Sequence, residues 1–335
     1  MTFKKSPSPL NSVSSSENYC CATTLLEKIL MLVIILNVLT ITKCLGQDPA
    51  LPATNLGFTG VLDGVAGPPG LVYVNYTQIY QLWQVNNEFG NAQRTNMKIN
   101  VLLSLHQIIL QSNTRIIGGN LAFTLILPIV KISAINRDGP SPSINSGPFG
   151  DLTVGPALLW KNKLFLGKPF SHRLEFDLTL PTGSFGKQYN INSSSHLYVY
   201  SLYHTFTYSV SRWLTVSVHN QFNYNSCILG SEIKPGAFYN GNYAISYPIS
   251  KLLRAEITGY YLTQLNQDAF NGNRRYYLEK YNVTNTKEKL AALGPGINFS
   301  NSSGLSIEGK VFFETEATNR AQGYRPTIIL AIPLH

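Results

Sequence analysis

The chain has 335 residues, and only 13% of them are charged, against about a quarter in an ordinary soluble domain. Its 26 Lys and Arg outnumber its 17 Asp and Glu, which gives a formal net charge of +9. The 19 Tyr, 16 Phe and 3 Trp exclude a mostly disordered chain, and a single stretch is apolar enough to suggest a helical span.

The first expected element is an export signal. Ile29–Ile41 is an almost uninterrupted apolar run, but it is shorter than the ~20 residues that a helix needs to cross a bilayer. Such a run suits the hydrophobic part of a secretory signal peptide, and Cys44 and Gly46 are small residues before a cleavage site. We therefore expect a signal peptide with a polar N-terminal region over 1–46, cleaved after Gly46. An uncleaved anchor is the alternative.

The next segment, 47–70, is rich in Gly and Pro. Two interpretations are open: a flexible periplasmic tail, or a plug that enters the domain that follows. Cleavage after Gly46 would leave Cys227 as the last cysteine, so no intramolecular disulfide is expected in the exported chain.

From residue 71 to 335 apolar and polar residues alternate with a period of two, which predicts strands. In Arg173–Leu180 every second residue is apolar and the residues between them are polar or charged. We expect no helix in this region. The predicted strands are 71–84, 96–111, 120–135, 150–161, 171–181, 196–209, 212–226, 236–248, 251–267, 288–299, 304–317 and 326–334.

The lengths of the links between these strands also alternate, because long links follow odd strands and shorter links follow even strands. This rhythm is typical of outer-membrane barrels, which have short periplasmic turns and longer external loops. The predicted fold class is all-β: one antiparallel up-and-down transmembrane β-barrel of about 12 strands, in the outer membrane of a Gram-negative bacterium. A soluble β-sandwich also alternates, but it needs no such rhythm. Aromatic residues near strand ends are expected in interfacial girdles: Trp83, Trp160, Trp213, Tyr80 and Tyr203.

Charged residues at the polar positions of these strands would project into the barrel lumen. Because both signs are present, they can either orient small polar solutes or close the lumen through ion pairs. We expect a narrow channel, and a closed barrel is the alternative. The lumen-lining candidates are Arg173, Glu175, Asp177, Arg254, Glu256, Glu308, Lys310 and Glu314.

Enzyme motifs are absent from the sequence, including Gly-x-Ser-x-Gly, His-Glu-x-x-His and a Walker loop. We therefore expect no enzyme: no catalytic residues, no metal and no cofactor. A pair of His219 with a serine on a neighbouring strand is the least favoured alternative. The expected partners are outer-membrane lipid, a small-molecule solute, and lipopolysaccharide phosphates attracted by Arg274, Arg275 and Lys280. Nucleic-acid binding is not expected, because the basic residues are scattered.

Four short motifs carry a resemblance to a known family: Gly67–Gly70 (GPPG), Gly150–Pro156 (GDLTVGP), Leu180–Phe185 (LPTGSF) and Lys234–Gly236 (KPG). In this order and spacing, over roughly 67–335, the chain resembles outer-membrane barrels associated with the meta-cleavage pathway of phenol degradation. The resemblance implies a transporter-like role for aromatic or other hydrophobic compounds. The predicted function is an outer-membrane channel for passive passage of small solutes. The alternative is a non-transporting structural or adhesive outer-membrane barrel.

Overall fold

The computed structural model describes residues 52, 55–65, 67–93 and 96–334, which all belong to one compact unit, Gln47–His335. The expected signal peptide over 1–46 lies outside the described residues. The barrel predicted from residue 71 onward begins with a strand at Gly70.

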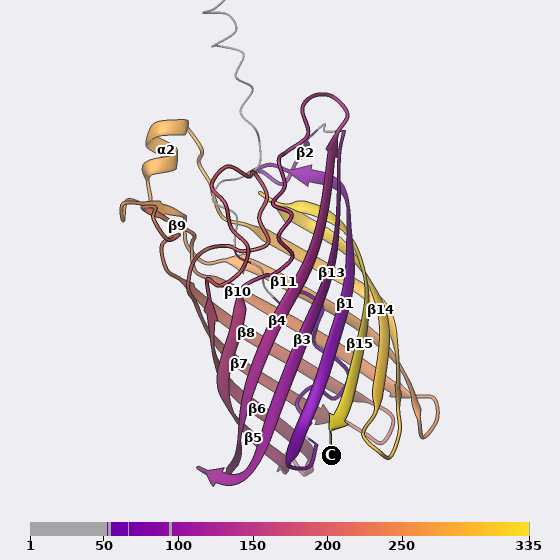
Figure 1. The fold of residues 1–335 in the computed structure, drawn as a ribbon. Helices are drawn as coiled ribbons and strands as arrows, with labels where there is room; N and C mark the ends of the chain where they lie inside the picture. The colour runs from indigo at the N-terminus through magenta and orange to yellow at the C-terminus, as the bar shows by residue number, and fades with distance from the viewer. Residues whose placement is uncertain (1–51, 53–54, 66, 94–95, 335) are drawn as a thin grey trace, which may run out of the picture. The chain divides into compact units, whose positions relative to one another are not determined.

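Twelve long strands close into an antiparallel barrel, which confirms the predicted fold class (Figure 1). Each strand pairs with the next long strand in the chain, and β15 pairs with β1 from Leu71↔Leu334 to Val85↔Ala321. The barrel strands are β1 (Gly70–Asn86), β3 (Met97–Ile116), β4 (Gly119–Asn136), β5 (Leu152–Phe165), β6 (Lys168–Leu180), β7 (Val199–Ser209), β8 (Thr215–Asn225), β10 (Phe238–Pro248), β11 (Leu253–Gln264), β13 (Lys289–Ser300), β14 (Ser306–Thr318) and β15 (Ala321–Leu334).

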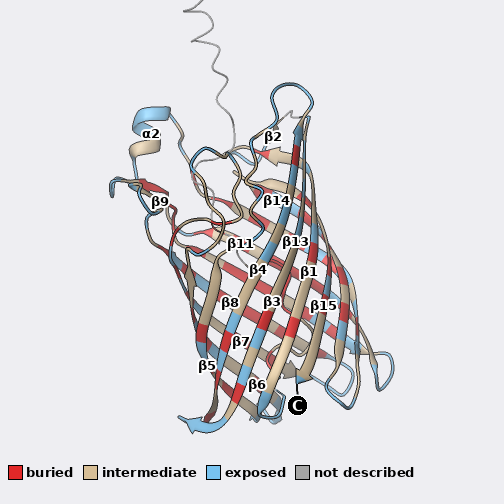
Figure 2. Cartoon of the chain, viewed as in Figure 1, coloured by how far each residue is buried: buried red, intermediate tan, exposed pale blue. Residues whose placement is uncertain are grey.

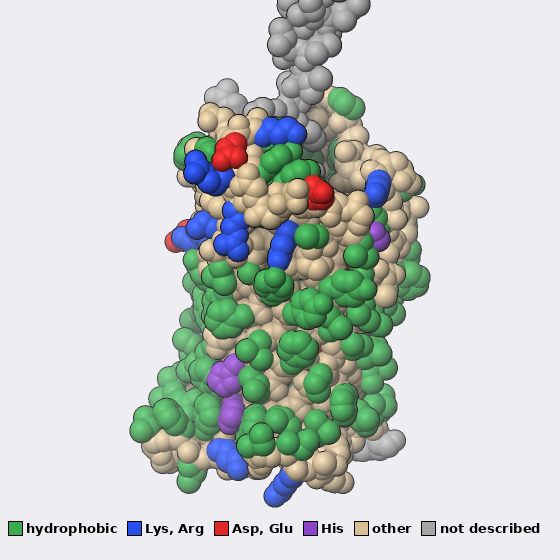
Figure 3. Space-filling model, turned by 90° about the vertical axis from the view of Figure 1, so that its left-hand side faces the viewer, with side chains coloured by type: hydrophobic (Ala, Val, Ile, Leu, Met, Phe, Trp, Pro, Cys, Tyr) green, Lys and Arg blue, Asp and Glu red, His purple; other side chains and the backbone are tan. Residues whose placement is uncertain are grey.

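Buried and exposed residues alternate along the barrel strands (Figure 2), and most of the buried residues are polar or charged. On β6, Leu174 and Phe176 are 40% and 48% exposed, whereas Glu175 and Asp177 are 5% and 2% exposed. Every long strand has a hydrogen-bonded neighbour on both sides, so the ring has no open edge, as the hydrocarbon core of a membrane requires. In the view of Figure 3, hydrophobic side chains form a belt around the strands, and most Lys and Arg side chains lie beyond it.

The two ends of the barrel differ in their connections. At the turn end, where β1 begins and β15 ends, the links are short: Ile117-Gly118 and Leu166-Gly167 each have both φ angles in the left-handed region, as tight hairpins require. At the loop end five links are long and carry the small elements β2 (Ala92–Gln93), β9 (Ile233–Lys234), β12 (Ala269–Phe270) and α2 (Tyr276–Tyr281), whereas the link between β14 and β15 is only Asn319-Arg320. The predicted alternation of link lengths holds for the other links and was wrong for the one between β14 and β15, which is a tight turn.

The expectation of no helix was wrong at α2, a six-residue helix in the loop between β11 and β13. Its C-cap Asn282 adopts a left-handed φ of 56°, and its N–H bonds the carbonyl of Leu278. Six residues, fewer than two turns, are too few to produce a helical period in the sequence. Among the described residues, no helix has the length and apolar character needed to cross a bilayer.

The predicted aromatic girdle was partly wrong. Trp83 and Trp213 point outward and are 49% and 48% exposed. Tyr80 and Tyr203 point inward instead: the Tyr80 ring lies 3.9 Å from the guanidinium of Arg325, and Tyr203 lines an internal cavity. The reason is the position of each tyrosine in its strand: it is an even number of residues away from the inward-facing polar residues, so it points to the same side.

Candidate functional site

A segment that precedes β1 lies inside the barrel. These residues, 55–65, are called the inner segment below. Near the loop end, Asn240 Nδ2 donates to the carbonyl of Asn55 at 2.9 Å. Near the turn end, the N–H of Leu62 donates to Ser217 Oγ at 3.1 Å and that of Gly64 to Thr207 Oγ1 at 3.0 Å. The segment therefore runs through the lumen from the loop end to the turn end.

Glycine allows this close approach. A Cβ added at Gly64 would lie 2.5 Å from the backbone nitrogen of Thr207, so no larger residue fits against β7 there. Gly57 has a left-handed φ of 83°, and its N–H donates to Asn242 Oδ1 at 2.7 Å. That the segment 47–70 acts as a plug, one of its two predicted interpretations, is a proposal that these contacts support.

The inner segment meets a charged cluster on β6 and β8 through Asp63. The carboxylate of Asp63 lies 3.8 Å from Arg173 Nη2 and 3.5 Å from His219 Nδ1. The same guanidinium lies 3.2 Å from Glu175, and His219 Nδ1 also lies 3.0 Å from Thr205 Oγ1. His219 thus contacts an aspartate and a threonine, which is not the serine pairing that an acyl-transfer dyad needs.

The charges around Asp63 decide its ionisation. Burial alone would raise the pKa of this carboxyl, but the neighbouring Arg173 guanidinium and the hydrogen bond from His219 outweigh burial. The pKa of Asp63 is therefore held below its ordinary value of 3.8. At neutral pH the inner segment presents a carboxylate to the guanidinium on the wall.

A second charged cluster lies on β14. The ammonium of Lys310 pairs with the carboxylate of Glu308 and donates to the carbonyl of Thr59 at 2.7 Å. Glu308 also accepts from the N–H of Val61 at 3.0 Å. Glu256 of β11 is buried nearby, and an added Cβ on Gly296 would lie only 2.2 Å from its carboxylate. The wall supplies both charges here, and the inner segment supplies only backbone groups.

A third cluster lies closer to the loop end. Glu314 of β14 accepts from Arg325 Nε and from the Tyr260 hydroxyl, each at 2.6 Å, and from the N–H of Gly323 at 2.7 Å. Arg325 also donates to Gln78 Oε1 at 3.0 Å. These bonds join β1, β11, β14 and β15 across the interior near the β1–β15 seam.

Among the eight predicted lumen residues, the structure brings Arg173, Glu175 and Asp177 together on β6, and Glu256, Glu308 and Lys310 together around β14. Glu314 belongs to the third cluster. Arg254 stands apart near the turn end, where it donates to Thr215 Oγ1 at 3.0 Å. Their part in lining a transport path is a proposal, which is taken up below.

Sequence reasoning missed the uncharged interior residues and Asp63. Four buried amides are hydrogen-bonded in the lumen: Asn240, Asn242, Gln221 and Asn223. They occupy every second position of their strands, so the alternation in the sequence could have predicted that they face inward. Asp63 carried no such signal, because the inner segment has no period of its own.

Two cavities lie beside the inner segment, one toward each end of the barrel. The loop-side cavity, of about 160 Å³, reaches loop residues Asp151 and Ser195. The turn-side cavity, of about 610 Å³, reaches the turn residue Ser303 and the barrel end at Leu334. Six residues line both cavities and form the partition between them: Phe58, Asp63, Tyr76, Gln107, Arg173 and Glu175.

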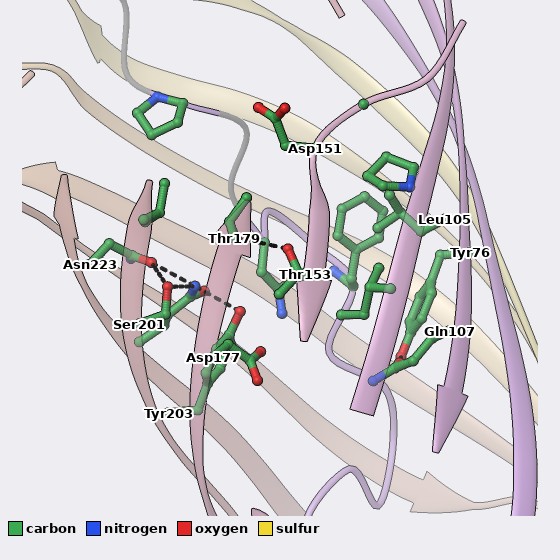
Figure 4. Close-up of a pocket in the computed structure, with 18 of the residues that line it drawn as sticks. Tyr76, Leu105, Gln107, Asp151, Thr153, Asp177, Thr179, Ser201, Tyr203 and Asn223 are labelled. Carbon is green, nitrogen blue, oxygen red and sulfur yellow. Dashed lines mark hydrogen bonds between the residues drawn. The ribbon is translucent and has the colours of Figure 1, made fainter. Parts of the chain in front are cut away.

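The loop-side cavity has two unlike walls, as Figure 4 shows in part. Strands β3 and β4 supply an apolar wall: Leu103, Leu105, Ile126, Pro128 and Val130. Strands β5 to β8 supply a polar wall: Thr153, Asp177, Thr179, Ser201, Tyr203, Gln221 and Asn223. On the polar wall, the Gln221 amide donates to the Tyr203 hydroxyl at 2.8 Å, and the Thr153 and Thr179 hydroxyls are 2.8 Å apart.

Three of the motifs that carried the family resemblance lie at the loop end, and two of them contact each other. Asp151 accepts from the N–H of Gly183 at 3.0 Å, and an added Cβ on Gly183 would lie 2.6 Å from the backbone of Gly150. Gly236 likewise lies against backbone, since an added Cβ would be 2.0 Å from the carbonyl oxygen of Asn266. These motifs are therefore sites of close backbone packing that hold the loops over the barrel.

A family model described as "Putative MetA-pathway of phenol degradation" matches residues 84–327. The chain belongs to this family. A comparison with curated protein sequences found no match. The match of the family model covers the barrel from the end of β1 to β15, so the predicted resemblance is confirmed.

Solved structures share the barrel. An outer membrane channel from Pseudomonas putida F1 has a TM-score of 0.67 at 12% identity, and the match covers 84% of this chain and 100% of that chain. The transport unit of the autotransporter AIDA-I from Escherichia coli has a TM-score of 0.45 at 9% identity, covering 87% and 95%. The CymD monoaromatic hydrocarbon channel has a TM-score of 0.41 at 10% identity, covering 80% and 89%. At such identities the likeness is one of fold: this is a barrel of the Gram-negative outer-membrane type.

Proposed function

We propose that this family member is an outer-membrane channel for the passive passage of small solutes. The observation that carries the proposal is the pair of cavities that approach each other from opposite ends of the barrel. They are separated only by the partition of six residues, three of which carry charge. A solute entering from the loop side would reach the turn side by passing between the inner segment and β1, β3 and β6.

The solutes that suit this path are small aromatic or otherwise hydrophobic compounds with a polar group. The loop-side cavity offers an apolar wall on β3 and β4 and hydrogen-bonding groups on β5 to β8. Its volume of about 160 Å³ is close to that of an apolar cavity known to hold one benzene ring, ~150 Å³. An aromatic ring with one hydroxyl would place its ring on one wall and its donor on the other.

In this proposal the eight charged residues divide into two roles. Arg173, Glu175 and Asp177 line the loop-side cavity, and Glu308 lines the turn-side cavity. Of the other four residues, Lys310 bonds the inner segment, Arg254 and Glu314 bond other wall residues, and Glu256 is buried beside Glu308 and Lys310. We assign no catalytic role to any of them.

The exterior fits an outer-membrane setting in which lipopolysaccharide is a partner. Arg274 and Arg275 are exposed beside α2, and Lys280 lies on it. Basic side chains at the loop end attract the phosphates of lipopolysaccharide. An export signal over 1–46 is part of the same proposal.

Swelling of proteoliposomes tests the proposal. Vesicles with the barrel are compared with protein-free vesicles in small sugars, amino acids and phenols. We expect swelling above that of the protein-free vesicles, with phenols ranked first. A variant without residues 55–64 should swell faster with every solute and should pass larger sugars, because it lacks the inner segment. The point variant Asp63→Asn leaves the wall intact and should increase swelling to a smaller extent.

The alternative is a structural or adhesive barrel that transports nothing. The hydrogen bonds of the inner segment across the lumen are the observation that favours it. A folded barrel that gives no swelling above protein-free vesicles, with or without the inner segment, would reject the channel and support this alternative.

A further inference from the structure

The charge of this chain is divided between its interior and its surface. Seven carboxylic side chains are buried among the described residues, and four of them pair with the interior cations Lys310, Arg173, Arg320 and Arg325. The buried acids are Glu175, Asp177, Glu256, Asp268, Glu288, Glu308 and Glu314. The acids therefore outnumber the cations that pair with them. A low-dielectric space with an excess of one sign of charge concentrates ions of the opposite sign.

The loop-side cavity has the same excess of acid. Carboxylates of Asp63, Asp151, Glu175 and Asp177 line it, against the single guanidinium of Arg173. That guanidinium lies between Asp63 and Glu175, at 3.8 and 3.2 Å. The carboxylate of Asp151 accepts from Ser194 Oγ at 2.6 Å and from the N–H of Ser195 at 2.9 Å. Asp63, Glu175 and Asp151 therefore have partners, and Asp177 is the remaining carboxylate of this cavity.

Asp177 is 2% exposed, and its Oδ1 has no hydrogen-bond partner among the described residues. Oδ1 packs against the neighbouring strand at Gly155, where an added Cβ would lie 2.0 Å away, so only glycine fits beside it. Ser201 lies directly opposite Asp177 on β7, and Thr179 is the next inward residue on β6 (Figure 4). A buried carboxylate with an unfilled acceptor site and two hydroxyl neighbours is suited to a donor that brings positive charge.

We propose that the loop-side cavity binds small organic cations, with the Asp177 carboxylate as the partner of an ammonium group. An ammonium has three donors, and Asp177, Ser201 and Thr179 offer oxygens at neighbouring inward positions. The hydrocarbon part of the ligand would lie on the apolar wall formed by β3 and β4. This inference rests on the proposed channel, because it names the class of solute that the channel path favours.

The test uses three probes of one shape and different charge: benzylammonium, benzyl alcohol and benzoate. Binding to the folded barrel in detergent is measured by titration calorimetry, and the rise in unfolding temperature gives a second readout. We expect benzylammonium to bind at least about tenfold more tightly than benzyl alcohol, because charge-assisted hydrogen bonds are the stronger class. Benzoate should bind most weakly.

Two variants locate the effect. In Asp177→Asn the preference for benzylammonium over benzyl alcohol should disappear, because the amide has no charge. In Asp138→Asn the preference should be unchanged, since Asp138 is an exposed loop residue that bonds Asn96 Nδ2 and does not line the cavity. If Asp177→Asn does not fold, Ser201→Ala should weaken benzylammonium binding more than benzyl alcohol binding.

The outcomes separate this inference from the proposed function. Equal affinity for benzylammonium and benzyl alcohol would overturn the cation site while leaving the channel standing. A preference that survives in both Asp177→Asn and Ser201→Ala would overturn the assignment to Asp177. If no probe binds and the vesicles do not swell, both proposals are rejected.

Discussion

The inner segment is held at two charged contacts that work in different ways. At the first contact, Asp63 offers its own carboxylate to Arg173 and His219 on the wall. At the second, the segment offers only the carbonyl of Thr59 and the N–H of Val61 to a wall pair, Lys310 and Glu308. The first contact depends on which residue occupies position 63, whereas the second depends only on where the backbone runs.

This difference indicates how each contact can be broken. A substitution at position 63 of the inner segment can remove the first contact. The second contact is made by backbone groups, so it remains when a side chain of the segment is replaced by another that fits the lumen. Only a change on β14 can remove the second contact. The following predictions separate the two contacts by their effects on the free energy of unfolding, measured by denaturant titration of the folded barrel.

The largest effect is expected for Lys310→Met. The Lys310 side chain is 0% exposed, and its loss leaves the buried carboxylates of Glu308 and Glu256 without a cation. Removing one partner of a buried ion pair costs about 3–5 kcal/mol. Lys289→Met is the matched control: its pair with Glu316 is largely exposed, and such pairs contribute about 1 kcal/mol or less. Equal costs for the two variants would show that the second contact does not stabilise the barrel.

A smaller effect is expected for Asp63→Asn, which breaks the first contact from the side of the segment. The variant loses a charge-assisted interaction, which typically contributes about 1.5–3 kcal/mol, but Arg173 keeps Glu175 as a partner. Its cost should therefore be clearly below that of Lys310→Met. A loss of unfolding free energy as large as that of Lys310→Met would mean that the two contacts contribute equally to the stability of the barrel.

The difference between wild type and Asp63→Asn should depend on pH. Because the folded pKa of Asp63 lies below its ordinary value of 3.8, its stabilisation is complete above that value. It should be lost as pH falls through the lower folded pKa. The stability gap should therefore be constant from pH 7 to about pH 5 and should narrow below about pH 4. A gap that narrows between pH 7 and 5 instead would contradict the lowered pKa.

The smallest effect is expected for Thr59→Val at the second contact. The hydroxyl of Thr59 is buried without a hydrogen-bond partner among the described residues, while its carbonyl makes the bond to Lys310. Replacing an unsatisfied hydroxyl by a methyl of similar shape should change the free energy of unfolding by about 0.5 kcal/mol or less, or stabilise the barrel. A loss above 1 kcal/mol would show that the side chain, and not only the backbone, makes this contact.

Much of the barrel was predictable because a membrane imposes a strict rule on strands. Residues such as Leu174 and Glu175 must face opposite media, so strand positions and link rhythm follow from the alternation. Tyr80 and Tyr203 were wrongly assigned to the girdle because tyrosine suits both an interface and a polar lumen. The prediction followed the residue type, whereas the position in the strand determines the side to which the ring points.

The candidate site was harder to predict, because it depends on contacts between distant parts of the chain. That Asp177 faces Ser201 follows from the register between β6 and β7, which no local pattern fixes. The meeting of Asp63 with Arg173 depends on the path of an irregular segment through the lumen. The excess of buried acid was partly visible, since five of the eight predicted lumen residues are acidic.

The seam between β1 and β15 has a consequence for assembly. It joins the first and last strands of the barrel, so it brings together the residues most distant in sequence and should be the slowest pairing to form. The inner segment precedes β1 and is therefore synthesised before any strand. Either the curling sheet encloses the segment before the seam shuts, or the segment must be drawn in through an open end afterwards. In the first order of events, its bonds to β7, β8 and β14 would give the open sheet a template around which to close.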